Sequence, residues 1–276
     1  MFPTLFDPAT IDPEAFARTM QRPAATVRYV IYFTPRTGSS WLTDIAKRTR
    51  QLSTPGECFN PHFVPGIARK LNAGDMDGYV NALLRHRNTK GVFGCQLTHF
   101  QLSKVFETEE RFLAYFGSAP CFWLIREDIV LQAVSLSKKQ QSKIGHRTMA
   151  DAEQLQAADR KFVYDAENVE HWLGHIRKAE IRTEAMFRQH RLMPLRLSYE
   201  IITGLSPLQA VNVIAAHIGV PPVDAAELSS DHEKIGTDKN AAFAARFRAD
   251  HPRLMRKITS QREPMLAGLN RRPPGL

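Results

Sequence analysis

The sequence predicts an α/β protein, a single domain with a parallel central sheet flanked by helices. Four short apolar runs have the length and composition of buried strands, and they lie at 28–34, 92–97, 120–125 and 194–198. Long segments with helical periodicity separate them, and this alternation indicates parallel strands joined by right-handed crossovers. Ligands of such sheets bind beyond the carboxyl ends of the strands. The residues that directly follow each run are therefore the first candidates for a functional site.

Five helices are expected between these strands, and each has apolar residues that recur at helical spacing. They cover residues 39–50, 78–87, 107–117, 127–142 and 167–190, and a further helix is expected to begin near Lys239. We divide the chain of 276 residues into an N-terminal extension over 1–25, one domain over 26–265 and a C-terminal tail over 266–276.

The first strand runs directly into a glycine turn and the start of a helix. This junction consists of Pro35, Arg36, Thr37, Gly38, Ser39, Ser40 and Trp41. Backbone N–H groups of such a turn and of the first helical residues point at one spot, where the helix dipole adds partial positive charge. Glycine allows the close approach of an anion. The junction therefore predicts a site for a phosphate-like group.

The same turn differs from the phosphate-binding loop of nucleoside triphosphatases. That loop reads G-x-x-x-x-G-K-[ST], whereas here Gly38 is followed by Ser39 and no glycine stands at the required earlier position. The cation of this turn is Arg36, whose planar fork of donors suits a tetrahedral oxyanion. The pattern favours a phosphate or sulfate group that is handled without a metal.

A second anion site is expected after the third strand. Arg126 ends that strand, and Ser135 follows nine residues later in a Gln-Ala-Val-Ser segment of the next helix. Nine residues are about two and a half helical turns, so both side chains can reach one anion. An ion pair between Arg126 and a neighbouring acid is the simpler alternative for the arginine alone.

These segments resemble sulfotransferases that use 3′-phosphoadenosine-5′-phosphosulfate (PAPS), and most closely the bacterial trehalose 2-sulfotransferase family. The resemblance implies the P-loop-like sulfotransferase fold. It also implies that residues 35–41 bind the 5′-phosphosulfate and that Arg126 and Ser135 bind the 3′-phosphate. Lys234 stands where the family usually has an arginine near the nucleotide, and Ile235 replaces the usual glutamine. The resemblance further places Tyr199 near the nucleotide, in a structural role.

Two residues compete for the role of general base. Glu57 lies 21 residues after Arg36, the spacing at which the family has a glutamate, and a positioned carboxylate can accept the proton of an attacking hydroxyl. His99 follows the second strand in Leu-Thr-His, which partly resembles the Lys-Thr-His element of many eukaryotic sulfotransferases. We rank Glu57 first and His99 second. An exposed loop acid and a pocket-lining histidine are the corresponding structural interpretations.

Composition sets limits on partner and compartment. The net charge of +9 requires acidic partners or ligands, and PAPS meets this requirement as well as nucleic acid does. No nucleic-acid motif with interleaved aromatic residues accompanies the charge, so we expect no nucleic-acid partner. No apolar run long enough to span a bilayer and no signal peptide are apparent, which leads us to expect a cytoplasmic protein. No metal site is expected, and a homodimer is plausible by resemblance.

The sequence thus predicts transfer of a sulfuryl group from PAPS to a hydroxyl group of a carbohydrate or glycolipid acceptor. A small-molecule kinase with a variant phosphate loop is the first alternative, although the missing Gly-Lys-Ser/Thr argues against it. A non-catalytic protein that binds anions or nucleic acid is the second. It would need the positive charge but neither Glu57 nor paired phosphate sites.

Overall fold

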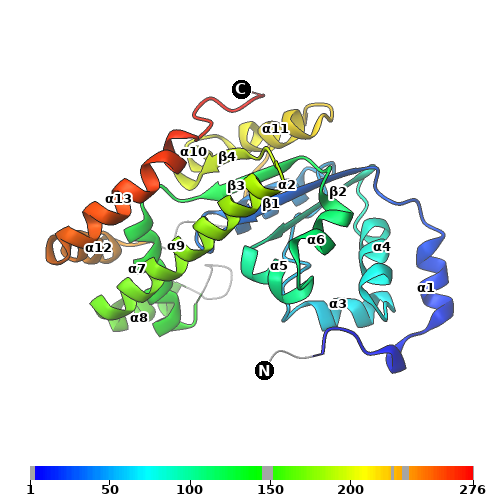
Figure 1. The fold of residues 1–276 in the computed structure, drawn as a ribbon, viewed down its shortest axis with the longest axis horizontal. Coiled ribbons are helices and arrows are strands. Elements are labelled where there is room, and N and C mark those ends of the chain that lie inside the picture. Colours follow the sequence, from blue (N-terminus) through cyan, green and yellow to red (C-terminus); the bar gives the residue numbers. More distant parts are fainter. Residues whose placement is uncertain (1–3, 145–151, 225–226, 232–235, 276) are drawn as a thin grey trace.

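The central sheet has four parallel strands (Figure 1). A computed structural model describes residues 4–144, 152–224, 227–231 and 236–275 of the chain. The strands lie in the order β2-β1-β3-β4, with bounds Val27–Phe33 for β1, Val92–Leu97 for β2, Cys121–Ile125 for β3 and Leu195–Ser198 for β4. All four strands stand where the apolar runs predict them, so the predicted α/β class is confirmed.

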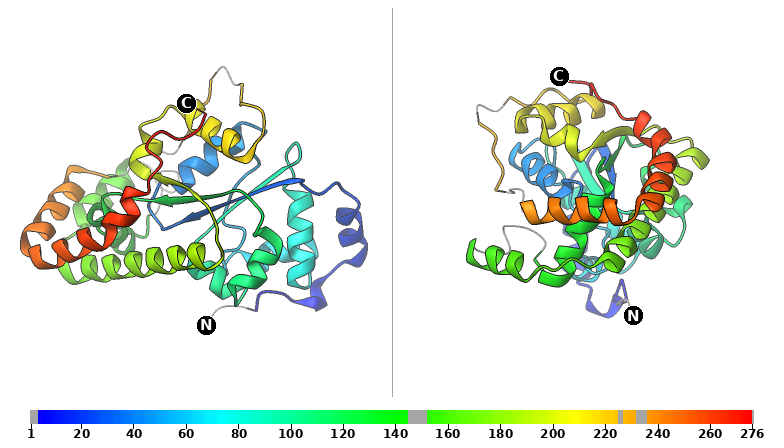
Figure 2. Two further views of the ribbon diagram at one scale, coloured as in Figure 1. Left: turned by 45° about the horizontal axis from the view of Figure 1, so that its top comes forward. Right: turned by 90° about the vertical axis from the view of Figure 1, so that its left-hand side faces the viewer.

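Helices cover both faces of the sheet (Figure 2). Alternate residues of β1 face opposite sides, since Val30 and Tyr32 join one apolar cluster while Tyr29, Ile31 and Phe33 join another. The first cluster lies under α3 (Val64–Leu71), α4 (Met76–His86), α5 (His99–Val105) and α6 (Glu109–Phe116). The second lies under α2 (Ser39–Arg48), α10 (Tyr199–Thr203) and α11 (Pro207–Ile218). Both faces are thus buried, as a parallel sheet requires.

A third apolar cluster extends the protein beyond the carboxyl ends of the strands (Figure 2). It brings together residues of α7 (Ile129–Ser142), α9 (Ala166–Gln189), α12 (Asp238–Asp250) and α13 (Pro252–Ala267), with α8 (Ala152–Lys161) beside α7. The edge of the sheet where parallel strands end is therefore walled on one side by helices.

The predicted helices correspond to α2, α4, α6, α7 and α9, and the helix expected near Lys239 is α12. The sequence analysis missed α1 (Pro13–Met20), α3, α5, α8, α10, α11 and α13. Several of these are short, yet α1 carries a clear start signal, because the Asp12 carboxylate accepts hydrogen bonds from the N–H groups of Glu14 and Ala15. The predicted outer segments pack against the domain through α1 on α4 and through buried Leu269. Their separation from it stays a prediction.

We expect Gly94→Ala to destabilise the sheet. A Cβ atom at Gly94 would lie 2.3 Å from Cζ of Tyr29, whose ring is buried and whose hydroxyl donates a 2.7 Å hydrogen bond to the Leu52 carbonyl. Because this ring is held at both ends, overpacking should cost about 1–3 kcal/mol of unfolding free energy in urea titrations.

Gly174→Ala is the matched control, because nothing lies within 4 Å of the added atom in the middle of α9. It should raise the unfolding free energy by about 0.5–1 kcal/mol. Equal stability of the Gly94→Ala protein and the parent would contradict the packing of Tyr29 on β2.

Candidate active site

The turn after β1 adopts the conformation of an anion-binding loop. Arg36 and Gly38 both have positive φ angles, 72° and 81°. A Cβ atom at Gly38 would lie 3.1 Å from Cδ2 of Tyr199, so this position is crowded as well as left-handed. Gly38 is also the N-cap of α2, and it has no side chain that could cap the helix. The N-terminal N–H groups of α2 are therefore offered at the carboxyl end of the sheet.

Side chains behind the loop hold it in this shape. The Thr37 hydroxyl donates a 2.8 Å hydrogen bond to the carbonyl of Thr34, which closes the turn. The buried Gln132 amide, on α7, donates to the Thr34 hydroxyl at 2.9 Å and to the Pro35 carbonyl at 2.7 Å. Sequence reasoning noticed the Gln-Ala-Val-Ser segment but gave Gln132 no role. Its signal was a polar residue on the otherwise apolar face of a helix.

The Arg126 side chain reaches the main chain of Arg36 in the loop. The Nη1 atom of Arg126, at the end of β3, donates a 3.4 Å hydrogen bond to the main-chain carbonyl of Arg36. Burial and the neighbouring charge of Arg126 lower the pKa of Arg36. The Arg126 guanidinium lies on the ring of Tyr199, 4.5 Å from its centre, and its buried Nε has no hydrogen-bond partner, although Glu200 is 3.8 Å away. An anion bound between or beside these two charges would reduce their repulsion.

The predicted pair of anion sites forms one continuous surface. The Nε of Arg36 donates a 2.9 Å hydrogen bond to the Ser135 hydroxyl on α7, so the residues expected to bind different phosphates touch each other. Ser39 is buried at the start of α2, and Trp41 packs against the apolar cluster beneath that helix. The register of β1 with β3 brings these parts together, since Phe33 pairs with Leu124 at the ends of both strands.

Glu57 lies at the end of the neighbouring strand β2. The segment that carries it runs beside that strand, where the N–H of Gln96 donates a 3.1 Å hydrogen bond to the Gly56 carbonyl. Two amides orient the carboxylate, because its Oε2 accepts hydrogen bonds from Asn60 at 2.9 Å and from Gln101 at 2.6 Å. Gln101 is also part of the capping box of α5. The other carboxylate oxygen, Oε1, takes part in neither of these two hydrogen bonds.

His99 is the first residue of α5, and its ring is engaged within the protein. The Nε2 atom lies 2.9 Å from Glu109 on α6, and Nδ1 lies 3.4 Å from the Ser103 hydroxyl. The same Glu109 carboxylate is 2.9 Å from Nε2 of His190 at the end of α9. The structure thus places His99 in a bridge between α5, α6 and α9. Its ring is directed to this bridge, whereas Gln101 of the same helix is directed to Glu57.

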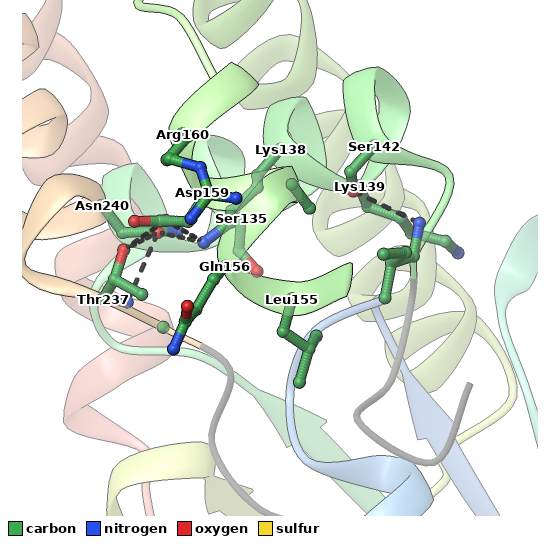
Figure 3. Close-up of a pocket in the computed structure, with 13 residues that line it drawn as sticks. Ser135, Lys138, Lys139, Ser142, Leu155, Gln156, Asp159, Arg160, Thr237 and Asn240 are labelled. Carbon is green, nitrogen blue, oxygen red and sulfur yellow. Dashed lines mark hydrogen bonds and ion pairs between the residues drawn. The ribbon is translucent and has the colours of Figure 1, made fainter. Parts of the chain in front are cut away.

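A cavity of about 390 Å³ is lined by Ser135, the α7 residue that is hydrogen-bonded to Arg36 of the loop (Figure 3). It lies between α7, α8 and the start of α12, and its wall contains an ion pair between Lys138 and Asp159 at 2.5 Å. The Thr237 hydroxyl donates to the same carboxylate at 2.7 Å, and Lys138 also reaches the Asn240 side chain at 3.3 Å. Lys139 and Arg160 line the cavity as well, so cationic groups outnumber acidic ones on its wall.

Lys234, predicted near the nucleotide, lies outside the described residues. The chain just before it is attached to α2, because the Asp44 carboxylate accepts hydrogen bonds from the Ser230 hydroxyl at 2.8 Å and from the Asp231 N–H at 3.3 Å. In the described ranges, His, Cys, Asp and Glu side chains form no group of three or more that could hold a metal ion. Within those same ranges no helix has both the length and the apolar character to cross a membrane.

The geometry can bind and polarise an oxyanion. A helix N-terminus, two arginines and a serine converge at the carboxyl end of β1 and β3, while an oriented carboxylate stands at the end of β2. Such an arrangement suits the transfer of a charged group to an acceptor that must lose a proton.

The comparisons agree with this chemistry. No curated protein matches the sequence. A family model described as Stf0 sulphotransferase matches residues 28–250, which include all of the sheet except Val27, the loop after β1 and most of the helices. This chain therefore belongs to the Stf0 sulfotransferase family and is a sulfotransferase.

Proposed function

We propose that the protein transfers the sulfuryl group of PAPS to a hydroxyl group of a carbohydrate or glycolipid acceptor. The observation that supports the proposal is the contact of Arg36 with both Arg126 and Ser135, because it brings together the residues of the two proposed oxyanion sites. PAPS carries oxyanions on both sides of one ribose, so a single molecule of it can occupy both sites.

The loop residues would hold the donor by its phosphosulfate. The N–H groups of residues 37–40 and the Arg36 guanidinium would bind the 5′ end, while Arg126 and Ser135 would bind the 3′-phosphate. Negative charge develops on the 5′-phosphate as it leaves, and fixed donors stabilise that charge without reorganising. Catalysis of this kind depends on positioning and electrostatics, as in phosphoryl transfer.

Glu57 is the proposed general base. The acceptor oxygen would attack sulfur in line, forming the new S–O bond while the bond from sulfur to the bridging phosphate oxygen breaks. The acceptor proton would pass to Glu57, and adenosine 3′,5′-bisphosphate would leave. The amides of Asn60 and Gln101 hold one oxygen of Glu57, which supports a fixed orientation of the other. The engagement of His99 with Glu109 favours Glu57 over the histidine.

The cavity beside Ser135 supports an anionic or highly polar ligand. Cationic residues line it together with Ser135, which we assign to the 3′-phosphate, and we therefore propose that the cavity binds part of the nucleotide. We place the reaction in the cytoplasm, where PAPS is made, with no metal and no nucleic-acid partner, and a homodimer fits the resemblance. Calorimetric titration with adenosine 3′,5′-bisphosphate, ATP and a short oligonucleotide tests the donor. Binding of ATP or the oligonucleotide in preference to the bisphosphate would contradict the proposal.

Arg36→Ala should lower kcat about 10²–10³-fold, because it removes one fixed donor from the leaving phosphate. Labelled PAPS and a panel of sugar and glycolipid acceptors provide the assay. The matched control is Arg50→Ala, since Arg50 is exposed and also has a positive φ angle, 50°. That variant should retain the parent rate, and an equal loss in both variants would assign the effect to backbone strain.

Glu57→Gln should lower kcat about 10²–10⁴-fold with little change in the affinity for adenosine 3′,5′-bisphosphate. Glutamine keeps an oxygen that can accept the hydrogen bonds from Asn60 and Gln101 but accepts no proton. His99→Gln is the comparison variant and should keep most of the activity. The reverse order of the two rates would give the role of base to His99.

Gln132→Leu should weaken binding of adenosine 3′,5′-bisphosphate about tenfold and cost about 1–3 kcal/mol of unfolding free energy. The change removes both hydrogen bonds to the loop and leaves the Pro35 carbonyl without this donor. Calorimetry and urea unfolding measure the two effects. Gln189→Leu, at an exposed position in α9, should change neither, whereas unaltered binding by Gln132→Leu would show that the loop keeps its shape unaided.

A further inference from the structure

A buried ion pair lies behind the residues that follow β3. Arg262 of α13 contacts the Glu180 carboxylate of α9 through Nε at 3.1 Å and through Nη2 at 2.9 Å. The two side chains are 3% and 0% exposed. Arg177 donates a further 2.5 Å hydrogen bond to Glu180, so the carboxylate has two cationic partners. Burying such groups is costly, and an ion pair of this kind is weak evidence for stability alone.

Arg262 also donates hydrogen bonds to the main chain at the candidate site. Its Nη2 donates a 2.5 Å hydrogen bond to the carbonyl of Arg126, and its Nη1 donates a 2.7 Å bond to the carbonyl of Glu127. These are successive carbonyls of the corner from which the Arg126 side chain leaves the sheet. A rigid guanidinium that binds both carbonyls fixes the orientation of the intervening peptide.

Other side chains hold the same corner from the opposite direction. The Glu200 carboxylate accepts hydrogen bonds from the N–H groups of Glu127 at 2.9 Å and of Asp128 at 3.4 Å. The Glu127 carboxylate accepts from the Ser198 hydroxyl at 2.6 Å and from Arg271 at 3.0 Å. Hydrogen bonds from several elements therefore hold this corner. Its arginine partners come from α12, through Arg248 on the Asp128 carboxylate at 2.5 Å, as well as from α13 and the segment after it.

The position of Arg262 in the chain makes this contact informative. The family model matches residues 28–250, whereas α13 spans Pro252–Ala267 and Arg271 lies further on. In Figure 1 α13 runs along the outside of the helical wall, next to α9 and α12. A segment beyond the matched region thus reaches into the protein and contacts the main chain of the proposed 3′-phosphate residue.

We infer that Arg262, oriented by Glu180, is a positioning residue for the donor nucleotide. It sets the direction in which Arg126 leaves β3, and thereby the placement of the Arg126 guanidinium on Tyr199 and beside Arg36. The α13 segment is then part of the nucleotide site in function, although it contributes no group that touches the nucleotide. The inference rests on the proposed binding of the 3′-phosphate by Arg126.

The test compares binding and turnover in Arg262→Met. Methionine keeps the apolar part of the side chain and removes every donor, while Arg177 remains as the partner of Glu180. We expect the Kd for adenosine 3′,5′-bisphosphate and the KM for PAPS to rise about tenfold, with kcat at saturating PAPS within about threefold of the parent. Arg256→Met, at an exposed position of the same helix, should change none of these values.

A double-variant cycle separates positioning from general support. In an Arg126→Ala protein, a further Arg262→Met change should weaken nucleotide binding by less than twofold, because the group that it positions is gone. Arg262→Lys, which keeps a charge and can reach one carbonyl, should give an intermediate Kd. If Arg262→Met does not fold, Glu180→Gln takes its place, since it preserves size and removes the charge that orients Arg262.

Each outcome has a distinct meaning. If Arg262→Met binds the nucleotide as the parent does, or if its effect is undiminished in the Arg126→Ala background, the inference is wrong and the proposed function stands. If the parent itself does not bind adenosine 3′,5′-bisphosphate, the donor assignment fails and the inference fails with it.

Discussion

The main constraint on this site is that two like charges, those of Arg36 and Arg126, lie near each other at one edge of the sheet. Their repulsion and partial burial oppose the folded state, as the lowered pKa of Arg36 indicates. Burial of apolar side chains offsets this unfavourable free energy, chiefly in two clusters that cover the sheet and in a third around α7 and α9. An anion bound at the proposed site would relieve this cost.

The parallel sheet determines which groups can meet. Because all four strands end at the same edge, the residues that follow them come from distant parts of the sequence and still lie together. The two arginines follow the central strands β1 and β3, and the segment with Glu57 runs beside the outer strand β2. An acidic group and two basic groups are thus brought to the same edge of the sheet.

Buried polar side chains fix the orientation of the segments that form the site. Gln132 binds the loop after β1, Gln101 binds Glu57, and Arg262 binds the corner after β3. Each lies on a helix that packs against the sheet or against the helical wall, and each is buried. Buried donors find acceptors within the protein, and here Gln132 donates to a hydroxyl and a carbonyl of the loop, Gln101 to the Glu57 carboxylate, and Arg262 to two carbonyls of the corner.

Much of this arrangement follows from local sequence. Apolar runs identified every strand, because a strand buried on both faces needs a continuous apolar segment. The loop of Arg36 and Gly38 was also predicted from the chain, since turns and helix starts depend on neighbouring residues. The candidates Arg126, Ser135 and Glu57 rested in addition on the resemblance to sulfotransferases. The short helices α3, α5 and α10 were missed, because packing against the sheet stabilises them more than their own pattern does.

The sequence by itself determined the α/β class, the four strands with α2, α4, α6, α7, α9 and α12, and the kind of group that follows the strands β1 and β3. Only the tertiary structure decided that Arg36 reaches Ser135, that the His99 ring is directed to Glu109, and that Arg262 supports Arg126 from a helix 136 residues away. The physical reason is that these contacts depend on strand register and helix packing. Both are settled by the burial of many distant side chains together, which no local pattern records.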